Sequence, residues 1–198
     1  MPEDRKGDAL DGALAALAEG FGSRLSAVRI NVEGAATHGR EMIGLKGTAA
    51  DYVVLPKVEH PKQVKDVFSV TQKPVIAMIH GFCIGGGVAV SLGADLRYAA
   101  DDATFGIPAA RLGVGYAMGG IEALADLVGL CNAKEILFTA RRYSASEALQ
   151  MGLVNRVFPK GELETQVREL ADQIAHNAPL TVRSVKLIAG ELQKPPDL

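Results

Sequence analysis

The chain has 198 residues, of which 48% are hydrophobic and 22% charged, and its formal net charge is −2. This length and apolar content are enough for one domain with a buried core, and the near balance of charge argues against a protein that attracts nucleic acid or a membrane surface. The start, "MPEDRKGDALDG", lacks the apolar stretch of a signal peptide, and no apolar run reaches the roughly 18 residues that span a bilayer. We therefore expect a cytoplasmic protein with no nucleic-acid or membrane partner.

The first third of the chain predicts one helix and one strand, followed by an irregular segment. Leucines recur at helical spacing over residues 9–19, and "AVRINVE" at 27–33 alternates like a strand. Residues 34–60 show no period and contain several glycines, so we predict a loop with short helical pieces. The stretch "QVKDVFSVTQ", residues 63–72, favours a helix that stops before Pro74.

The rest of the chain alternates short strands with helices, which predicts an α/β fold. A buried strand over 75–79 feeds a glycine run, and a helix over about 86–93 follows. Next come the short strands "DLRYAAD" and "ATFGI", and then two helices, "GGIEALADLVG" and "NAKEILFTA", the second opened by Asn132 with Glu135 three residues later. Ser144 and Glu147 repeat this capping pattern before the strand "LVNRVF". Two amphipathic helices complete the chain, at about 161–176 and 179–192, with Pro179 in a first turn.

The two cysteines, Cys83 and Cys131, lie in apolar surroundings and have no CxxC spacing. This pattern is typical of buried, unreactive thiols in a reducing compartment. His60 has no acidic or cysteine partner at metal-ligand spacing and His176 belongs to an amphipathic helix, so the sequence predicts no metal site.

The stretch "IHGFCIGGGVAV" places Gly85, Gly86 and Gly87 between a strand and a helix. The first turn of a helix leaves backbone N–H groups without partners, and the absence of side chains lets a ligand carbonyl approach them. The turn could therefore be an oxyanion site, or the glycines could only allow close helix packing. A phosphate loop is excluded because GxxxxGK[ST] is absent.

Two longer stretches carry a family resemblance. "KPVIAMIHGFCIGGGVAVSLGADLRYAADDATFGIPAARLGVGY" and "AKEILFTARRYSASEALQMGLVNRVFP" resemble the core of the crotonase (enoyl-CoA hydratase/isomerase) superfamily. The glycine turn, Asp95, the FG-x-P turn and the "A-x-x-x-GLV" helix occur in the family's order. The resemblance is strong over about residues 70–190 and weaker over 1–50.

The resemblance implies a spiral of β-β-α turns with a helical C-terminal region. The core would be residues 1–160, short at its N-terminus, and the helical region 161–198, truncated but part of the same functional unit. It also implies a homotrimer or paired trimers that bind acyl-CoA, with coenzyme A as part of the substrate and no separate cofactor. Asp95 would have a structural role, bonding the adjacent turn.

The resemblance assigns a site as well. The family stabilises an enolate with two backbone N–H groups on the thioester oxygen; carried over, these belong to Gly86 and to Arg40. Gly85, Gly87, Pro108, Ala89 and Ala109 would line the same substrate-binding site.

The resemblance also exposes two departures. Hydratases of the family carry glutamates two residues after the glycine run and directly after the proline of FG-x-P, and here these positions are Ala89 and Ala109. Alanine can neither orient water nor exchange a proton, so we expect ordinary hydratase activity to be weak or absent.

Three interpretations therefore remain open. The chain is an acyl-CoA enzyme that uses the oxyanion site without the glutamates, a non-catalytic acyl-CoA-binding homologue, or a malonyl-type acyl-CoA decarboxylase. The third interpretation rests on Tyr116, which a decarboxylase subgroup of the family shares, and on Arg40, which could hold a carboxylate. The alternative to this interpretation is that Arg40 points to solvent and that the Tyr116 ring only packs in the wall of the substrate pocket. Glu122 is the nearest downstream acid and could substitute for a missing one, or belong to a solvated helix face.

Overall fold

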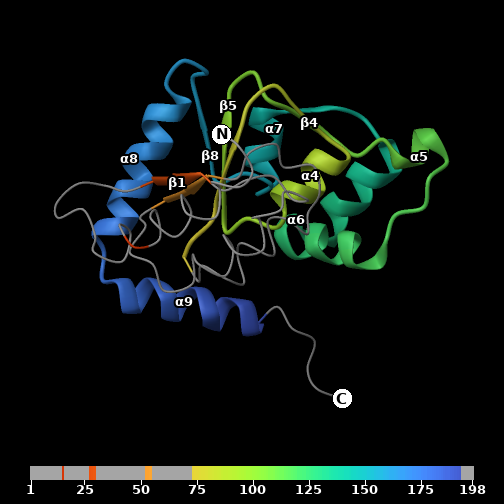
Figure 1. Cartoon of the computed structure of the whole chain (residues 1–198). Coiled ribbons are helices and arrows are strands. Elements are labelled where there is room, and N and C mark those ends of the chain that lie inside the picture. The colour runs from red at the N-terminus through yellow and green to blue at the C-terminus, as the bar shows by residue number, and fades with distance from the viewer. Residues whose placement is uncertain (1–14, 16–26, 30–51, 55–72, 193–198) are drawn as a thin grey trace, which may run out of the picture. The chain divides into compact units, whose positions relative to one another are not determined.

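The computed structural model describes Ala15, residues 27–29 and 52–54, and residues 73–192 (Figure 1). These fall in two units, which are described separately. In the first unit, the strands β1 (Ala27–Arg29) and β2 (Tyr52–Val54) pair in parallel. The predicted strand at 27–33 is thus confirmed for its first three residues. The predicted loop at 34–60 is wrong for β2, because "YVV" is a β-branched and aromatic run that pairs with β1. The predicted helix at 63–72 lies outside the described residues, as does that at 9–19 except for the helical Ala15.

The second unit contains the rest of the described elements. In chain order they are β3 (Ile76–Ile79), β4 (Phe82–Ile84), α4 (Gly86–Ser91), β5 (Leu96–Ala100), β6 (Thr104–Gly106), α5 (Ala109–Leu112), α6 (Met118–Thr139), β7 (Tyr143–Ser144), α7 (Ala145–Gln150), β8 (Arg156–Phe158), α8 (Leu163–His176) and α9 (Pro179–Leu192). The alternation of strands and helices that the sequence predicts is confirmed, and so is the α/β fold class with a helical C-terminal region. None of the helices in the described part of the chain is long and apolar enough to cross a membrane.

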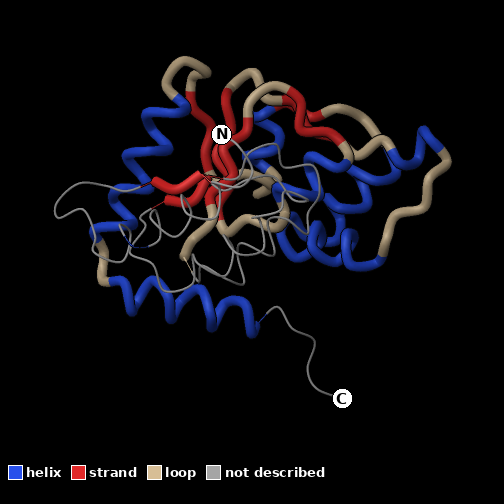
Figure 2. Tube along the Cα trace, in the orientation of Figure 1, coloured by secondary structure: helices blue, strands red, loops and turns tan. Residues whose placement is uncertain are grey.

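The strands of the second unit form two small sheets. One has the order β3-β5-β8 with parallel pairs, and the other has the order β4-β6-β7, in which β4 and β6 are parallel. Helix α8 lies on one side of the first sheet, and α4, α6 and α7 lie on the other (Figures 1 and 2). The first sheet is therefore covered on both faces.

Strand β5 shows why both faces need cover. Tyr98 and Ala100 point to one face and pack with Leu163 and Val167 of α8, while Ala99 points to the other face and joins the main core. Side chains alternate across a strand, so a strand with apolar residues at successive positions must be buried on both sides. Tyr98 also meets Phe158 of β8 edge to face, with ring centroids 6.1 Å apart.

Asp95 has the structural role that the sequence analysis expected. Its Oδ2 accepts a hydrogen bond of 2.6 Å from the N–H of Val75 and lies 3.1 Å from the Nζ of Lys186. The same ammonium group donates to the carbonyl of Lys73, and the Lys186 side chain is buried. Lys186 therefore ties α9 to the start of β3.

The stretch α6 confirms one prediction and contradicts two, which concern Asn132 and Cys131. The two helices predicted for this stretch are both present, and Gly129 (φ 78°, ψ 153°) is the non-helical residue at the kink between them. The second helix does not begin at Asn132, which lies inside it and donates from its side chain to the Val128 carbonyl at 2.9 Å. Cys83 is buried as expected, but Cys131 is exposed. Beyond the kink, the buried face of α6 carries Ala133 and Ile136, which leaves Cys131 on the outer side.

The second predicted capping pattern is confirmed at the start of α7. The N–H of Glu147 donates to the Ser144 hydroxyl at 3.2 Å, and the N–H of Ser144 donates to the Glu147 carboxylate at 2.8 Å. The Ser144 N–H and then the Arg141 guanidinium, 2.7 Å away, lower the pKa of Glu147 to about 2. The Arg141 guanidinium also stacks over the Tyr143 ring of β7 and pairs with Glu135 of α6. Arg141 therefore connects α6, β7 and α7.

Replacing Ser144 by alanine tests the contribution of this N-terminal cap of α7 to stability. We expect Ser144→Ala to lower the free energy of unfolding by about 0.5–2 kcal/mol, because the N–H of Glu147 loses its acceptor. Ser146→Ala, two residues on in the same helix, is the matched control and should change little. Urea denaturation of both variants measures the difference, and equal stabilities would contradict the role of the cap.

Candidate functional site

The glycine turn begins where β4 ends. Gly85 has φ 56° and ψ −108°, a conformation that residues with a side chain rarely adopt. Its N–H donates to the Gly106 carbonyl at 2.8 Å, and its carbonyl accepts from the N–H of Ala89 at 3.1 Å. A β-carbon on Gly85 would lie 3.8 Å from Pro108 Cδ. The turn is thus fixed against the end of β6 and the start of α5, which brings Gly85 and Pro108 together as predicted.

The next two glycines face opposite ways. A β-carbon on Gly87 would meet the Cys83 sulfur at 3.7 Å, whereas one on Gly86 would meet nothing within 4 Å. Gly86 is exposed, and in the described part of the chain its N–H donates no hydrogen bond. An exposed first-turn N–H beside open space can donate to a ligand oxygen.

The two alanines at the expected acid positions lie on the helices that flank this turn. Ala89 is in α4, and Ala109 is the first residue of α5, directly after Pro108. Both side chains are half-buried, and Ala109 packs against the main core. A methyl group cannot donate or accept a proton, so neither residue supplies acid or base chemistry.

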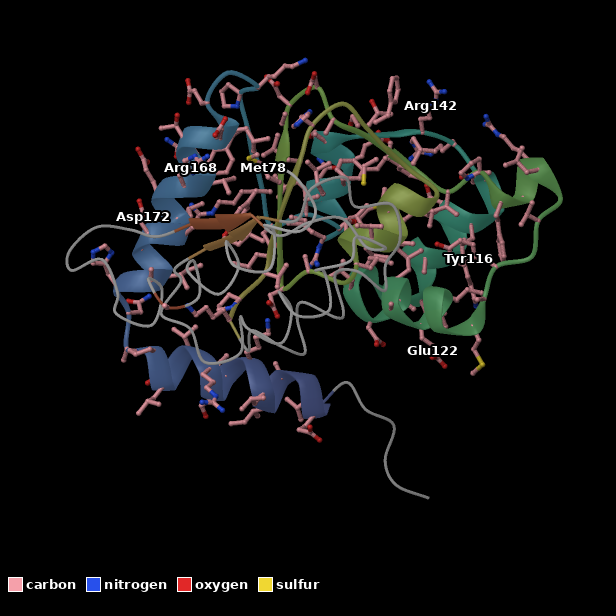
Figure 3. The ribbon with its side chains drawn as sticks, in the orientation of Figure 1. Met78, Tyr116, Glu122, Arg142, Arg168 and Asp172 are labelled. Carbon is pink, nitrogen blue, oxygen red and sulfur yellow. The ribbon has the colours of Figure 1, made fainter. Side chains whose placement is uncertain are left out.

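Tyr116 is the half-buried residue of an otherwise exposed loop between α5 and α6. A β-carbon on Gly120 would lie 2.7 Å from Tyr116 Cε1, so the ring rests on the first turn of α6 where only glycine leaves room. Burial raises the pKa of Tyr116, so its hydroxyl is neutral near pH 7. Glu122 follows Gly120 by two residues in α6 and is exposed (Figure 3), which agrees with a solvated helix face.

The predicted second donor and the possibility of a metal site remain to be considered. Arg40, the predicted second donor, lies outside the part that the structure describes. Among the described residues, no group of three or more histidine, cysteine, aspartate or glutamate side chains is placed to hold a metal ion.

Sequence reasoning missed two residues that support the site. Gly120 makes room for Tyr116, and no sequence signal distinguished it from its neighbour Gly119. Arg97 is buried on the core side of α4. A signal for Arg97 existed, because it is a charged residue inside the apolar strand "DLRYAAD", and buried charges need specific partners.

Comparison with known proteins identifies the class. Residues 49–191 match the model of the enoyl-CoA hydratase/isomerase family. This is most of the chain, so the chain belongs to that family, and the resemblance found in the sequence is confirmed.

Individual relatives agree with this assignment. A short-chain-enoyl-CoA hydratase of Clostridium acetobutylicum is 43% identical over 115 residues, which are 58% of this chain and 44% of the relative. A peroxisomal Δ(3,5)-Δ(2,4)-dienoyl-CoA isomerase of Arabidopsis thaliana is 44% identical over 118 residues, 59% of this chain and 42% of the relative. The chain thus matches less than half the length of each of these relatives.

A solved structure shows the same fold. The enoyl-CoA hydratase/carnithine racemase of Magnetospirillum magneticum superposes with a TM-score of 0.67 at 26% identity, covering 80% of this chain and 70% of that one. The crotonase-like fold predicted from the sequence is therefore confirmed.

Substitution of the first glycine tests the geometry of the turn. Gly85→Ala should lower the free energy of unfolding by about 1–3 kcal/mol, because a side chain is strained at φ 56°. Gly86→Ala, with open space around its β-carbon, is the matched control and should leave stability nearly unchanged. Denaturant titration compares the two, and a larger loss at Gly86 than at Gly85 would contradict the described turn.

Proposed function

We propose that this chain binds acyl-CoA thioesters and stabilises an enolate formed from them, with the N–H of Gly86 donating to the thioester oxygen. The observation that carries this proposal is the Gly86 N–H, which belongs to an exposed residue in the first turn of α4 and has no hydrogen-bond partner in the described residues. A β-carbon on Gly86 would meet no described atom within 4 Å, so there is room for a ligand beside this residue. Charge that develops on oxygen is stabilised best by donors that are already fixed in place, and Gly85 fixes this one. Membership of a family whose named relatives include a hydratase and an isomerase supports an enzyme of the lyase or isomerase kind.

The second donor is proposed to be the N–H of Arg40. With two donors on one oxygen, the thioester carbonyl would be held in a single orientation. Coenzyme A would enter as part of the substrate rather than as a separate cofactor.

Ordinary hydration is not part of the proposal. Adding water to an enoyl thioester needs a group that orients the water and one that moves a proton, and Ala89 and Ala109 supply neither. Reactions that need only enolate stabilisation fit the site better. Decarboxylation of a malonyl-type thioester is one of these, since it removes no carbon-bound proton.

Tyr116 bears on that decarboxylase interpretation. Its ring packs against Gly120 and the core, which supports a packing role in the wall of the substrate pocket. Its hydroxyl makes no hydrogen bond within the described residues. The hydroxyl would be available to a substrate carboxylate that Arg40 also holds.

We also propose that the protein assembles as a homotrimer or paired trimers. Large apolar side chains of α9 are exposed in the single chain, with Leu180 at 77% and Leu192 at 81%. Exposed apolar groups in such number favour cover by another surface.

The Gly86 assignment is tested by filling the open space beside it. Gly86→Val should weaken the binding of acetyl-CoA at least about tenfold, because the isopropyl group takes the place of the approaching carbonyl, while its β-carbon meets no atom of the described residues within 4 Å. Gly161→Val is the matched control, since its β-carbon also meets nothing within 4 Å but lies in the turn before α8. Calorimetric titration measures both, and unchanged affinity in a folded Gly86→Val would remove the assignment.

The missing acids are tested by restoring them. We expect slow hydration of crotonyl-CoA by the native chain and a larger gain for Ala89→Glu/Ala109→Glu than for either change alone, since two carboxylates that act on one water form a unit. One positioned acid or base typically contributes about 10²–10⁴-fold. Loss of the enoyl thioester absorbance follows the reaction, and Ala110→Glu, an exposed neighbour in α5, is the control.

Rapid hydration by the native chain would refute this explanation. Release of carbon dioxide from a malonyl-type thioester, without hydration, would favour the decarboxylase. Binding of acyl-CoA with neither reaction would favour a non-catalytic homologue.

A further inference from the structure

Arg97 of β5 is a charged side chain in the interior of the second unit, with only 5% of its surface exposed. Its guanidinium donates three hydrogen bonds to backbone carbonyls. Nη1 reaches Ala94 at 2.7 Å and Ser91 at 3.3 Å, and Nε reaches Leu153 at 3.1 Å. Burial lowers the pKa of Arg97, but a guanidinium remains charged in proteins. The side chain therefore links the end of α4 to the segment between α7 and β8.

The backbone of Arg97 is held as firmly as its side chain. Its N–H donates to the Asn155 side chain at 2.8 Å, and its carbonyl accepts from the N–H of Asn155, also at 2.8 Å. Arg97 is thus held in place through its backbone, and its side chain holds the end of α4 by hydrogen bonds.

A second set of contacts runs from the end of α4 to its first turn. The Ser91 hydroxyl, which is buried, donates to the Val88 carbonyl at 2.8 Å. The Ser91 side chain also acts on the thiol of Cys83: burial raises the pKa of this thiol to about 11, and Ser91 opposes the rise. The Cys83 sulfur would lie 3.7 Å from a β-carbon on Gly87. This thiol therefore packs as a neutral group under the turn.

We propose that Arg97 is a positioning residue for the Gly86 N–H. Helix α4 has six residues, which makes it about 9 Å long, so a shift at its last turn displaces its first. Dense packing transmits such a shift. The contacts of Ser91 and Cys83 connect the last turn of α4 with its first turn, so a displacement at Ser91 would reach Gly86 and Gly87. The inference rests on the proposed function, because it concerns the same oxyanion donor.

The consequence concerns enolate stability. A misplacement of about 1 Å caused by a remote change can cost about 10²-fold in rate, and a hydrogen bond to a developing oxyanion is equally sensitive to its direction. Loss of the Arg97 contacts should therefore weaken the enolate more than it weakens the neutral thioester.

Acetoacetyl-CoA is the probe for this effect. It loses a carbon-bound proton to solvent base and becomes an enolate that absorbs in the near ultraviolet, so a pH titration in the presence of protein gives the apparent pKa of the bound ligand. We expect the native chain to lower this pKa below that of the free thioester. Arg97→Lys, which cannot reach all three carbonyls at once, should raise it again by about one unit, which corresponds to tenfold weaker enolate stabilisation.

Lys186→Met is the matched control. Lys186 is also a buried cation that holds backbone in the second unit, but its hydrogen bonds to the Lys73 carbonyl and to Asp95 tie α9 to the start of β3. It should lower stability without moving the pKa of the bound ligand. An unchanged pKa in folded Arg97→Lys, or an equal change in both variants, would overturn the proposal.

A measurement without ligand separates this inference from the proposed function. In spectra of protein labelled with ¹⁵N-glycine, the signals of Gly86 and Gly87 should move in Arg97→Lys and stay in Lys186→Met. If the native chain leaves the pKa of acetoacetyl-CoA unchanged, the proposed function fails, and the glycine signals still decide whether Arg97 sets the turn. If Arg97→Lys does not fold, Ser91→Ala interrupts the same path, and unmoved glycine signals in that variant would overturn the proposal.

Discussion

The hydrogen bond from the Gly85 N–H to the Gly106 carbonyl is the interaction on which the site depends. It extends the parallel pairing of β4 and β6 by one step, at the point where the chain leaves β4 to enter α4. Without this hydrogen bond, nothing at Gly85 would hold the turn between β4 and α4 against the end of β6. The first turn of α4 would then not be kept next to the start of α5. One backbone bond thus sets where the exposed Gly86 lies relative to Pro108 and Ala109. The chemistry of the site is built mostly from main chain, which explains why so few side chains in it carry charge.

Much of the fold could be predicted from the sequence, because the deciding signals are local. The glycine run, the Ser144–Glu147 cap and Pro179 each act within one turn of backbone, and the structure has each of them at the predicted position in its element. Errors arose where a distant partner decides the outcome. Residues 52–54 form a strand that pairs with β1, and Asn132 lies just inside the second helix of α6, which follows the non-helical Gly129.

The candidate site was predictable in part. Its backbone features follow from glycine and proline, whose conformational preferences can be read in the sequence, and the loss of acids at Ala89 and Ala109 follows from residue identity. The support from Gly120, Ser91 and Arg97 depends on which atoms meet across elements, and no local pattern specifies that. A buried arginine can be suspected from an apolar strand, but its three carbonyl partners cannot be named before the fold is known.

The parallel pairing of the strands also bears on how the chain reaches this structure. Val75 and Asp95, which join β3 to the start of β5, are separated by 20 positions, whereas Arg97 and Asn155, which bring β8 to β5, are separated by 58. Closing the shorter loop costs less chain entropy, by about 1 kcal/mol for this ratio of lengths. The glycine turn lies inside that shorter loop. We therefore expect the contacts of low sequence separation, which enclose the glycine turn, to form before β8 and the Leu153 carbonyl reach β5 during folding.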